Sequence, residues 1–476
     1  MKNQPRTTRL VRSFAAHPGL GLLVVGLGTL SVPFDSAVNV AFPDIVRAFG
    51  LPISGIQWVV ISYTLTYAAL MLVFGRVGDM IGYRRIFRLG TGWSAAAFLL
   101  CAAAPSFPWL LGARVMQGVG AAMALSCGPA LATSLYPEAE RTRILALYTM
   151  LFSAGGAAGP ILAGQLVQYF GWPSVFWFRI PLSALALLLA AGLPAGEAQG
   201  KQRFDLPGAL LLVLTITAML LALNQLQHLD TAVWPLLLLT GVTAIAAAGF
   251  IVCEGKTAQP IIALHFFRNG NFTLINLANI FLNLAGFSIM LLMPFYLDRT
   301  AGLSVGNAGI VLAASPLGIM LAAPLAGRLA ERVSSRRLAL AGAAMMAVAQ
   351  ILIGEVGSHP NIALLTSFMA LQGVGLGLFQ VAYFDITTAS MPRQDRGVAG
   401  SLVMMTRTIG VVTAATVLML IFQMFRVATL AGGATEAAAF LAGFHGAFRI
   451  AAAISVIVVA AFLLRGWAKR PLHNGS

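Results

Sequence analysis

Charged side chains are scarce in this chain of 476 residues, of which only 9% are Asp, Glu, Lys or Arg. An average soluble protein is about 25% charged. A globule of this size cannot cover a water-facing surface with so few charges, and 59% of its residues are hydrophobic. Soluble enzymes, disordered proteins and fibrous proteins are therefore disfavoured, and the composition indicates an integral membrane protein.

Cysteine is also scarce, since Cys101, Cys127 and Cys253 are the whole complement. Their spacing fits neither a metal site nor a disulfide framework. The sequence has no phosphate-binding loop of the Walker type, so we expect no direct use of ATP. No nucleophile and base can be paired from their spacing. We therefore expect a protein that is not an enzyme and that needs no metal and no cofactor.

Apolar runs of membrane-spanning length fill the chain. A helix needs about 20 apolar residues to cross about 30 Å of hydrocarbon. A β-barrel would instead show short alternating strands. We therefore predict an all-α integral membrane protein with 14 transmembrane helices. They lie near residues 19–42, 55–77, 86–104, 109–135, 143–168, 172–193, 206–226, 232–253, 271–297, 304–329, 337–357, 361–388, 398–425 and 442–465.

Basic residues outnumber acidic ones, with 30 Lys and Arg against 15 Asp and Glu. They gather in short segments between the apolar runs, which favours a role in membrane orientation over nucleic-acid binding. If the N-terminus is inside, only Arg47, Arg299 and Arg426 fall in outside segments. The positive-inside rule therefore predicts a multi-pass protein with both termini in the cytoplasm.

Two motifs recur at nearly the same offset. Residues 75–85 and 327–337 share a Gly-Arg start, an acid and paired arginines, 252 residues apart. The Gln-Gly-Val-Gly of residues 117–120 returns 255 residues later. Such self-similarity indicates duplication, and a site between parallel halves is typical of secondary transporters. We predict a six-helix bundle over 1–200, two inserted helices over 201–258 and a second six-helix bundle over 259–476.

Four stretches resemble motifs of the major facilitator superfamily. Gly75–Arg85 resembles its loop motif between helices two and three, and Leu111–Gly120 resembles its fourth-helix motif. Phe34–Pro43 is similar to the signature of the fourteen-spanner drug:proton antiporter branch. The antiporter motif is matched by Gly155, Gly159, Pro160 and Gly164. The resemblance covers almost the whole chain and implies two bundles that rock about a central site, in the cell inner membrane.

The resemblance implies transport rather than catalysis. Inward-moving protons would drive the efflux of drugs or other small lipophilic, cationic compounds. The expected partners are a small-molecule substrate, protons and the lipid bilayer, and we expect a monomer. Arg179 departs from the branch, where Asn is common, and leaves open an exporter or importer of an endogenous anionic or neutral metabolite. A membrane sensor or scaffold is a third possibility, against which the gate and antiporter motifs count.

Asp35 and Arg114 are the leading candidates for proton coupling. Asp35 lies inside the first run, where an acid costs about 2.5–3.5 kcal/mol on insertion scales, so it should face a cavity or a partner. It either binds protons or a cation, or makes a hydrogen bond that only holds packing. Arg114 can hold carbonyls or a carboxylate of a neighbouring helix. The resemblance implies that Arg114 takes part in proton transfer or organises the first-helix site.

Other polar residues within the runs are candidates for coupling or substrate binding. Asp385 is either a second titratable acid or an interfacial carboxylate. Arg179 and Arg407 either attract an anionic cargo or pair with acids or backbone. A helical face carries three amides, which either line the cavity or form interhelical hydrogen bonds; they are Asn276, Asn279 and Asn283.

The loop and antiporter motifs carry the expected gating residues. Glycines let the chain turn sharply or let helices approach closely, and Pro160 should bend its helix. The resemblance implies that the loop motif forms a cytoplasmic gate. The alternative is that its basic residues only anchor the cytoplasmic side of the membrane. The resemblance also implies that tight packing at the antiporter motif seals the helix interface against leaks. The gate residues are Gly75, Asp79, Gly82, Arg84 and Arg85, with Glu331 in a weaker second copy.

Overall fold

The computed structural model describes residues 18–137, 140–193, 205–225, 233–256, 264–330, 332–390 and 396–466. Within these ranges every regular element is a helix, which confirms the all-α class. A helix satisfies its own backbone hydrogen bonds, and lipid offers no other partners for them. The chain divides into two compact units, one of residues 1–219 with 238–261 and one of residues 220–237 with 262–476.

The first unit contains the helices before residue 194 and most of the next two. Its elements are α2 (Pro18–Leu30), η1 (Pro33–Asp35), α3 (Ser36–Val40), α4 (Phe42–Phe49), η2 (Ile53–Ile56), α5 (Gln57–Ile81), α6 (Tyr83–Ala102), α7 (Phe107–Ser134), α8 (Arg141–Phe170), α9 (Ser174–Trp177) and α10 (Arg179–Ala190). Then follow α11 (Leu206–Gln225) and α12 (Trp234–Lys256). The end of α11, from residue 220, and the start of α12, up to residue 237, belong to the second unit.

The second unit repeats this series of long helices. Its elements are η5 (Leu264–Arg268), α13 (Gly270–Arg299), α14 (Val305–Leu312), α15 (Ala314–Ala330), α16 (Ser335–Gly354), α17 (Ile362–Ala389), α18 (Arg396–Ala431) and α19 (Glu436–Leu464). Polar caps begin several of them: the side-chain oxygen of Asn361, for example, accepts a hydrogen bond from the amide of Leu364 at 3.1 Å. Such caps satisfy amides that have no partner inside the helix.

Helices of membrane-spanning character dominate the described residues. Eleven of them are long and apolar enough to cross a membrane. Each predicted run holds a helix, but three fall short of that standard. α6 begins with arginines that lower its hydropathy, and the apolar helices over Ser174–Ala190 and Leu206–Met219 are shorter. The multi-pass character is therefore confirmed, while the number 14 stays a prediction.

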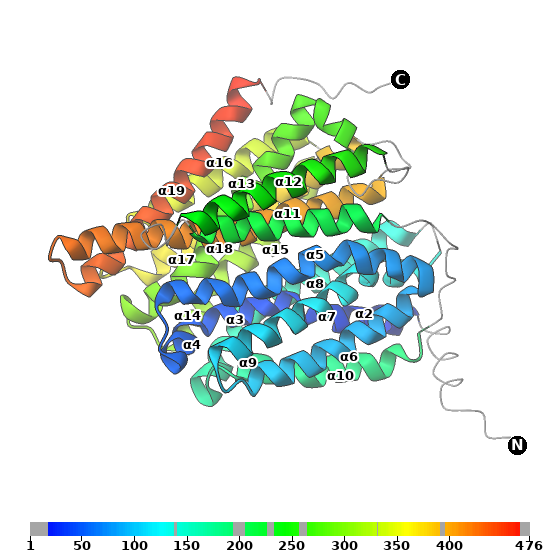
Figure 1. Ribbon diagram of the computed structural model, residues 1–476, viewed down its shortest axis with the longest axis horizontal. Helices are drawn as coiled ribbons and strands as arrows, with labels where there is room; N and C mark the ends of the chain where they lie inside the picture. Colours follow the sequence, from blue (N-terminus) through cyan, green and yellow to red (C-terminus); the bar gives the residue numbers. More distant parts are fainter. Residues whose placement is uncertain are drawn as a thin grey trace, which may run out of the picture. The chain divides into compact units, whose positions relative to one another are not determined.

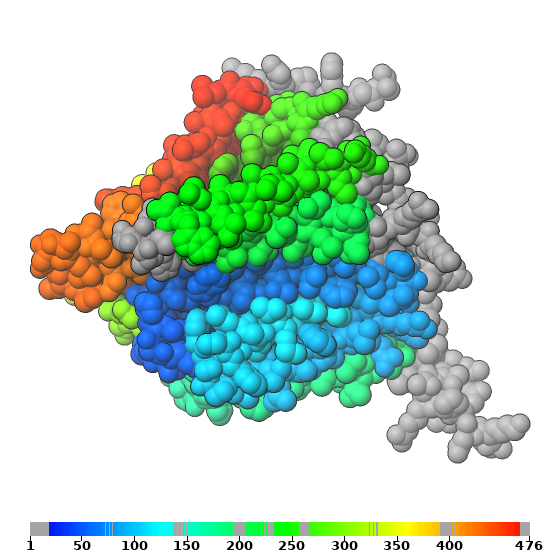
Figure 2. Space-filling model, in the orientation of Figure 1, coloured from blue at the N-terminus to red at the C-terminus, as the bar shows by residue number. Residues whose placement is uncertain are grey.

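Large apolar side chains on the surface fit a lipid environment. α12 lies on the face that Figure 2 shows. Its Leu237 is 68% exposed and its Ile245 is 76% exposed. In water such a surface would promote aggregation, whereas acyl chains solvate it at no cost.

The same packing pattern recurs inside each unit. α7 packs against α5 and α6 in the first unit, and α17 packs against α15 and α16 in the second (Figure 1). The first span, α2 with η1 and α3, packs against α8 and α10, as α13 packs against α18 and α19. The two series of helices thus correspond one to one, which agrees with the duplication that the sequence indicates.

Matching glycines bring these helices together. A Cβ on Gly120 of α7 would lie 3.1 Å from the carbonyl oxygen of Gly90 on α6. In the second unit a Cβ on Gly375 would lie 2.7 Å from the carbonyl oxygen of Gly342. Only glycine allows backbones to approach this closely. The Gln-Gly-Val-Gly repeat therefore marks equivalent points of helix contact.

Candidate functional site

Asp35 lies at a break in the first membrane span, at the end of η1. The guanidinium of Arg114 on α7 donates to both carboxylate oxygens, from Nη1 to Oδ1 at 2.6 Å and from Nη2 to Oδ2 at 2.8 Å. This is the bidentate geometry in which arginine binds a carboxylate most strongly. The fourth-helix motif and the acid of the first span therefore meet in one ion pair.

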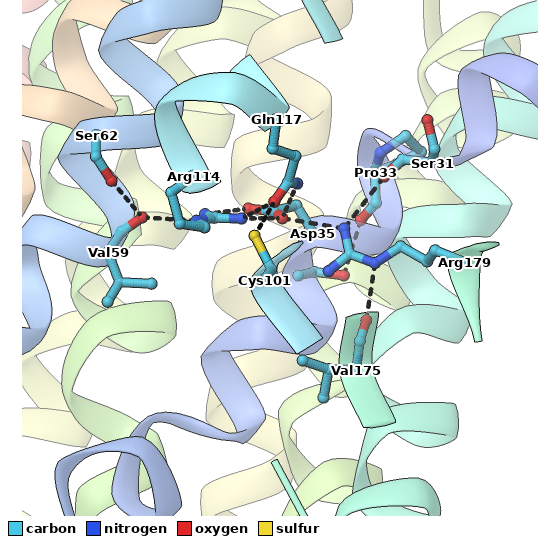
Figure 3. A network of polar contacts seen from close by, with 11 residues as sticks. Ser31, Pro33, Asp35, Val59, Ser62, Cys101, Arg114, Gln117, Val175 and Arg179 are labelled. Carbon is cyan, nitrogen blue, oxygen red and sulfur yellow. Dashed lines mark hydrogen bonds and ion pairs between the residues drawn. The ribbon is translucent and has the colours of Figure 1, made fainter. Parts of the chain in front are cut away.

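A second arginine shares the same carboxylate. Arg179, the first residue of α10, donates from Nη1 to Oδ1 of Asp35 at 3.1 Å. Its Nε donates to the carbonyl of Val175 at 2.8 Å. Three phenylalanine rings surround the guanidinium, and that of Phe98 lies 4.8 Å from its central carbon. Asp35, Arg114 and Arg179 thus form one cluster, drawn in Figure 3.

Arg114 is held in place by its neighbours on α7 and α5. Its Nε donates to the carbonyl of Val59 at 2.9 Å, and its central carbon lies 4.4 Å from the centre of the Tyr63 ring. Gln117 follows three residues later on the same face of α7, accepting from Arg114 at 2.8 Å and donating to Asp35 at 2.9 Å. Gly118 lets α7 approach α5 closely, since a Cβ on Gly118 would lie 2.8 Å from the Tyr63 carbonyl oxygen.

Charge in the cluster does not balance. Two guanidiniums that stay protonated at any working pH face one carboxylate. The side chains of Arg114 and Arg179 are 1% and 0% exposed, and that of Asp35 is 16% exposed. Asp35 is therefore the member of the cluster with access to the surroundings, and the only one whose charge can be removed by a proton.

The antiporter motif packs directly against the residue that follows Asp35. α8 continues through Pro160, which has no N–H to offer to the carbonyl of Gly156. The hydroxyl of Ser36 lies 3.1 Å from that open carbonyl oxygen. A Cβ on Gly159 would strike the Ser36 hydroxyl, and one on Gly155 would lie 2.6 Å from a methyl of Leu30. Gly164 is buried one turn further along α8.

The three asparagines of α13 belong to a buried hydrogen-bond network in the second unit. Asn276 accepts from the hydroxyl of Tyr383 on α17 at 2.8 Å, and Asn279 donates to the hydroxyl of Thr406 on α18 at 2.8 Å. Asn283 donates to the side chain of Asn279 at 2.9 Å. These contacts join three helices, so the amides hold α13, α17 and α18 together.

Asp385 and Arg407 lie apart from this network. Asp385 is exposed near the end of α17 and accepts from Ser335, at the start of α16, at 2.5 Å. Arg407 is half-buried in α18, and within the described ranges the structure gives it no hydrogen bond and no ion pair. The repeat counterpart of Arg114 is the apolar Met369, which is fully buried. Within the described residues, the Arg–Asp cluster of the first unit thus has no equivalent in the second.

The loop motif lies between α5 and α6. Gly82 ends α5 with a φ of 98°, a value that disfavours any side chain. Gly75 was expected to help this turn, but it lies inside α5 and a Cβ there would meet nothing closer than 3.7 Å. Arg84 donates to the carbonyl of Leu193 at 2.6 Å, and Arg85 is exposed. Glu331 and the side chain of Asp79 lie outside what the structure describes.

Several members of the cluster carried no strong signal in the sequence. Gln117 appeared only as part of the fourth-helix motif and of the repeated Gln-Gly-Val-Gly, with no role of its own. The carbonyls of Val59 and Val175 and the ring of Tyr63 had no signal, because each is brought to the cluster by tertiary packing. Among the described residues, no group of three or more His, Cys, Asp or Glu side chains is placed to hold a metal ion.

Comparison with known proteins matches this fold and these motifs. The sequence profile of the Major Facilitator Superfamily matches residues 24–253 and 275–476. The riboflavin transporter RibZ of Clostridioides difficile is 30% identical over 385 residues, covering 80% of this chain and 83% of that protein. The multidrug resistance protein Stp of Mycobacterium tuberculosis is 29% identical over 394 residues, covering 82% and 73%.

A solved structure shares the fold. The crystal structure of a POT family transporter in complex with 5-aminolevulinic acid superposes with a TM-score of 0.73 at 12% identity, covering 95% of this chain and 97% of that one. At such low identity the likeness concerns the architecture alone.

Proposed function

Since the chain belongs to the major facilitator superfamily and is a multi-pass membrane transporter of small molecules, we propose that it exports drugs or other small lipophilic compounds in exchange for protons. It would belong to the fourteen-spanner antiporter branch, with two six-helix bundles and two inserted helices. We place it in the inner membrane as a monomer with both termini in the cytoplasm. Alternating access would carry cargo outward as protons enter.

One observation carries the proposal. Asp35 is a partly exposed acid within a membrane span, held by Arg114 and Arg179 and packed beside the antiporter motif. Buried ionisable groups at membrane depth are costly and are retained where their charge is used. A proton on Asp35 weakens its bonds to both arginines, since a hydrogen bond to a charged acceptor is roughly twice as strong as one to a neutral acceptor. Proton binding would thereby change the packing of the first span.

Two proposals differ in the charge of the cargo. We expected cationic compounds from the antiporter resemblance. The cluster favours the second candidate, an exporter or importer of an endogenous anionic or neutral metabolite. Both oxygens of Asp35 are already bound by guanidiniums, and the excess positive charge repels a cation. The names of the relatives, a riboflavin transporter and a multidrug resistance protein, are compatible with either candidate.

A substrate panel in proteoliposomes tests the proposal. Vesicles with an acidic interior are given riboflavin, a cationic dye or a carboxylate-bearing dye, and accumulation is followed with and without a protonophore. We expect at least one compound to accumulate, only while the pH gradient lasts, and the compound that does so identifies the cargo class. Accumulation that persists after the gradient is collapsed, or none with any compound, contradicts proton-driven antiport.

A further inference from the structure

The first span is broken where Asp35 sits. Pro33 has no N–H, so it cannot bond the carbonyl of Thr29, which accepts instead from Val32 at 3.1 Å. The amide of Asp35 donates to the carbonyl of Val32 at 2.9 Å. The carbonyl of Ser31 is therefore left without the amide that a continuous helix would give it. A bare carbonyl in a membrane span needs another donor.

Arg179 supplies that donor and joins the two sides of the break. Its Nη1 lies 3.4 Å from the carbonyl oxygen of Ser31, at the end of α2, and 3.1 Å from Oδ1 of Asp35, just before α3. One nitrogen thus links the backbone on one side to the carboxylate on the other, as Figure 3 shows. Arg179 itself is fixed independently of Asp35, by the carbonyl of Val175 and by the ring of Phe98.

We infer that Arg179 is a positioning residue that ties the ionisation of Asp35 to the break between α2 and α3. While Asp35 is ionised, Nη1 holds both sides of the break. When Asp35 is neutral, Nη1 of Arg179 keeps only the Ser31 carbonyl, and the negative charge between Arg114 and Arg179 is lost. The two guanidiniums then repel each other, and α3 is released from α2. The role in transport rests on the proposed function; the link between ionisation and the break does not.

The surroundings of Asp35 contain few other charges. The titratable or charged side chains around the cluster are Tyr63 of α5, Cys101 of α6 and Arg114 of α7. Among the described side chains of α8 none is charged. The Ser36 hydroxyl lies 2.9 Å from the carbonyl oxygen of Pro33 and 3.1 Å from that of Gly156, and this contact holds the start of α3 against α8 whatever the charge of Asp35. The expected movement is therefore confined to the short stretch between the end of α2 and Ser36.

Hydrogen exchange of the full-length purified protein tests this link without any transport assay. We compare peptides covering residues 30–40 in the wild type, Asp35→Asn, Arg179→Gln and the double variant. Each single substitution should speed amide exchange in this stretch by roughly tenfold, the worth of one charge-assisted hydrogen bond. The double variant should exchange no faster than Asp35→Asn alone, because the bond that Arg179→Gln removes is already lost in that variant.

Two further variants separate positioning from general damage. Arg179→Lys keeps the charge and should retain more protection than Arg179→Gln. Arg407→Gln removes an arginine that lies outside the cluster and should leave residues 30–40 unchanged. Unaltered exchange in Asp35→Asn, or additive effects in the double variant, would overturn the inference and leave the proposed antiport standing. Coupled exchange together with failed proton-driven transport would remove the proposed function instead.

Discussion

At the scale of single residues, the molecule concentrates its buried charge on Asp35. The carboxylate accepts from Arg114, Gln117 and Arg179, which come from two different helices. A buried ion pair adds little net stability when intact, because desolvation offsets the attraction. Removing Asp35 would leave two buried guanidiniums without a carboxylate, whereas removing one arginine leaves a single Arg–Asp pair and takes hydrogen bonds from the carboxylate. The cluster should therefore be sensitive to loss of either arginine through those hydrogen bonds.

Replacing Arg114 with Leu should lower the stability of the purified protein by about 3–6 kcal/mol, because it removes two hydrogen bonds to the carboxylate, each worth about 1.5–3 kcal/mol. The substitution leaves Asp35 with a single arginine and removes the guanidinium from the carbonyl of Val59, which also accepts from the hydroxyl of Ser62 at 3.5 Å. Thermal unfolding in detergent measures the effect. Arg407→Leu is the matched control, because Arg407 is half-buried outside the cluster. Equal losses in the two variants would contradict the special place of Arg114.

Part of this cluster could be predicted from the sequence. Asp35 and Arg114 stood out because each is a charge within an apolar run. The contact between Asp35 and Arg179 could not be predicted, since 144 positions separate them and only tertiary packing brings them together. The roles proposed for Asp385 and Arg407 rested on the same kind of signal. A charge inside a run marks a candidate, but it does not reveal the partner.

At the scale of elements, glycine decides how the helices meet. Gly118 faces α5, and its repeat counterpart Gly373 faces the backbone of Ser315 at the equivalent place in the second unit. The sequence showed these glycines as a repeated motif without showing which helices they bring together. The break at Pro33 was hidden because the apolar run continues through it, and hydropathy does not report backbone hydrogen bonds. Helix existence was thus predictable, whereas helix interruption was not.

Replacing Gly118 with Val should disrupt the contact between α7 and α5. A Cβ at this position would lie 2.7 Å from that of Thr66, so the helices must separate. Overpacking of this kind costs about 1–3 kcal/mol, and backbone contact makes relief harder. The yield of monodisperse protein on size exclusion and its melting temperature measure the loss. Gly112→Val in the same helix is the control, because a Cβ there would meet nothing within 4 Å, and similar behaviour of the two variants would refute the prediction.

At the scale of the whole molecule, the two units follow one plan with different chemistry. Equivalent helices pack in the same pairs, yet the first unit holds the Arg–Asp cluster and the second holds a neutral amide and hydroxyl network. In the proposed transport cycle, the first unit would therefore be the one that responds to protons. The sequence indicated the duplication, but it carries no pattern from which the cargo can be predicted.

Membrane orientation is testable at the same scale. The distribution of basic residues predicts that the loop between α6 and α7 is outside and that the end of α17 is inside. A cysteine at Ser106 should react with a membrane-impermeant maleimide in intact cells. A cysteine at Ser390 should react only after the cells are permeabilised. Both positions are exposed, so access rather than burial decides the outcome; the reverse pattern would invert the proposed topology.

The most direct test of the account is cargo-dependent proton movement through purified protein in liposomes that contain a pH-sensitive dye. Wild type, Asp35→Asn and Asp44→Asn are compared, because Asp44 is also ion-paired, at 2.8 Å to Arg47, but lies on α4 away from the cluster. The account predicts that cargo drives proton flux through the wild type and Asp44→Asn, and none through a folded Asp35→Asn protein. Undiminished proton flux through Asp35→Asn would contradict it.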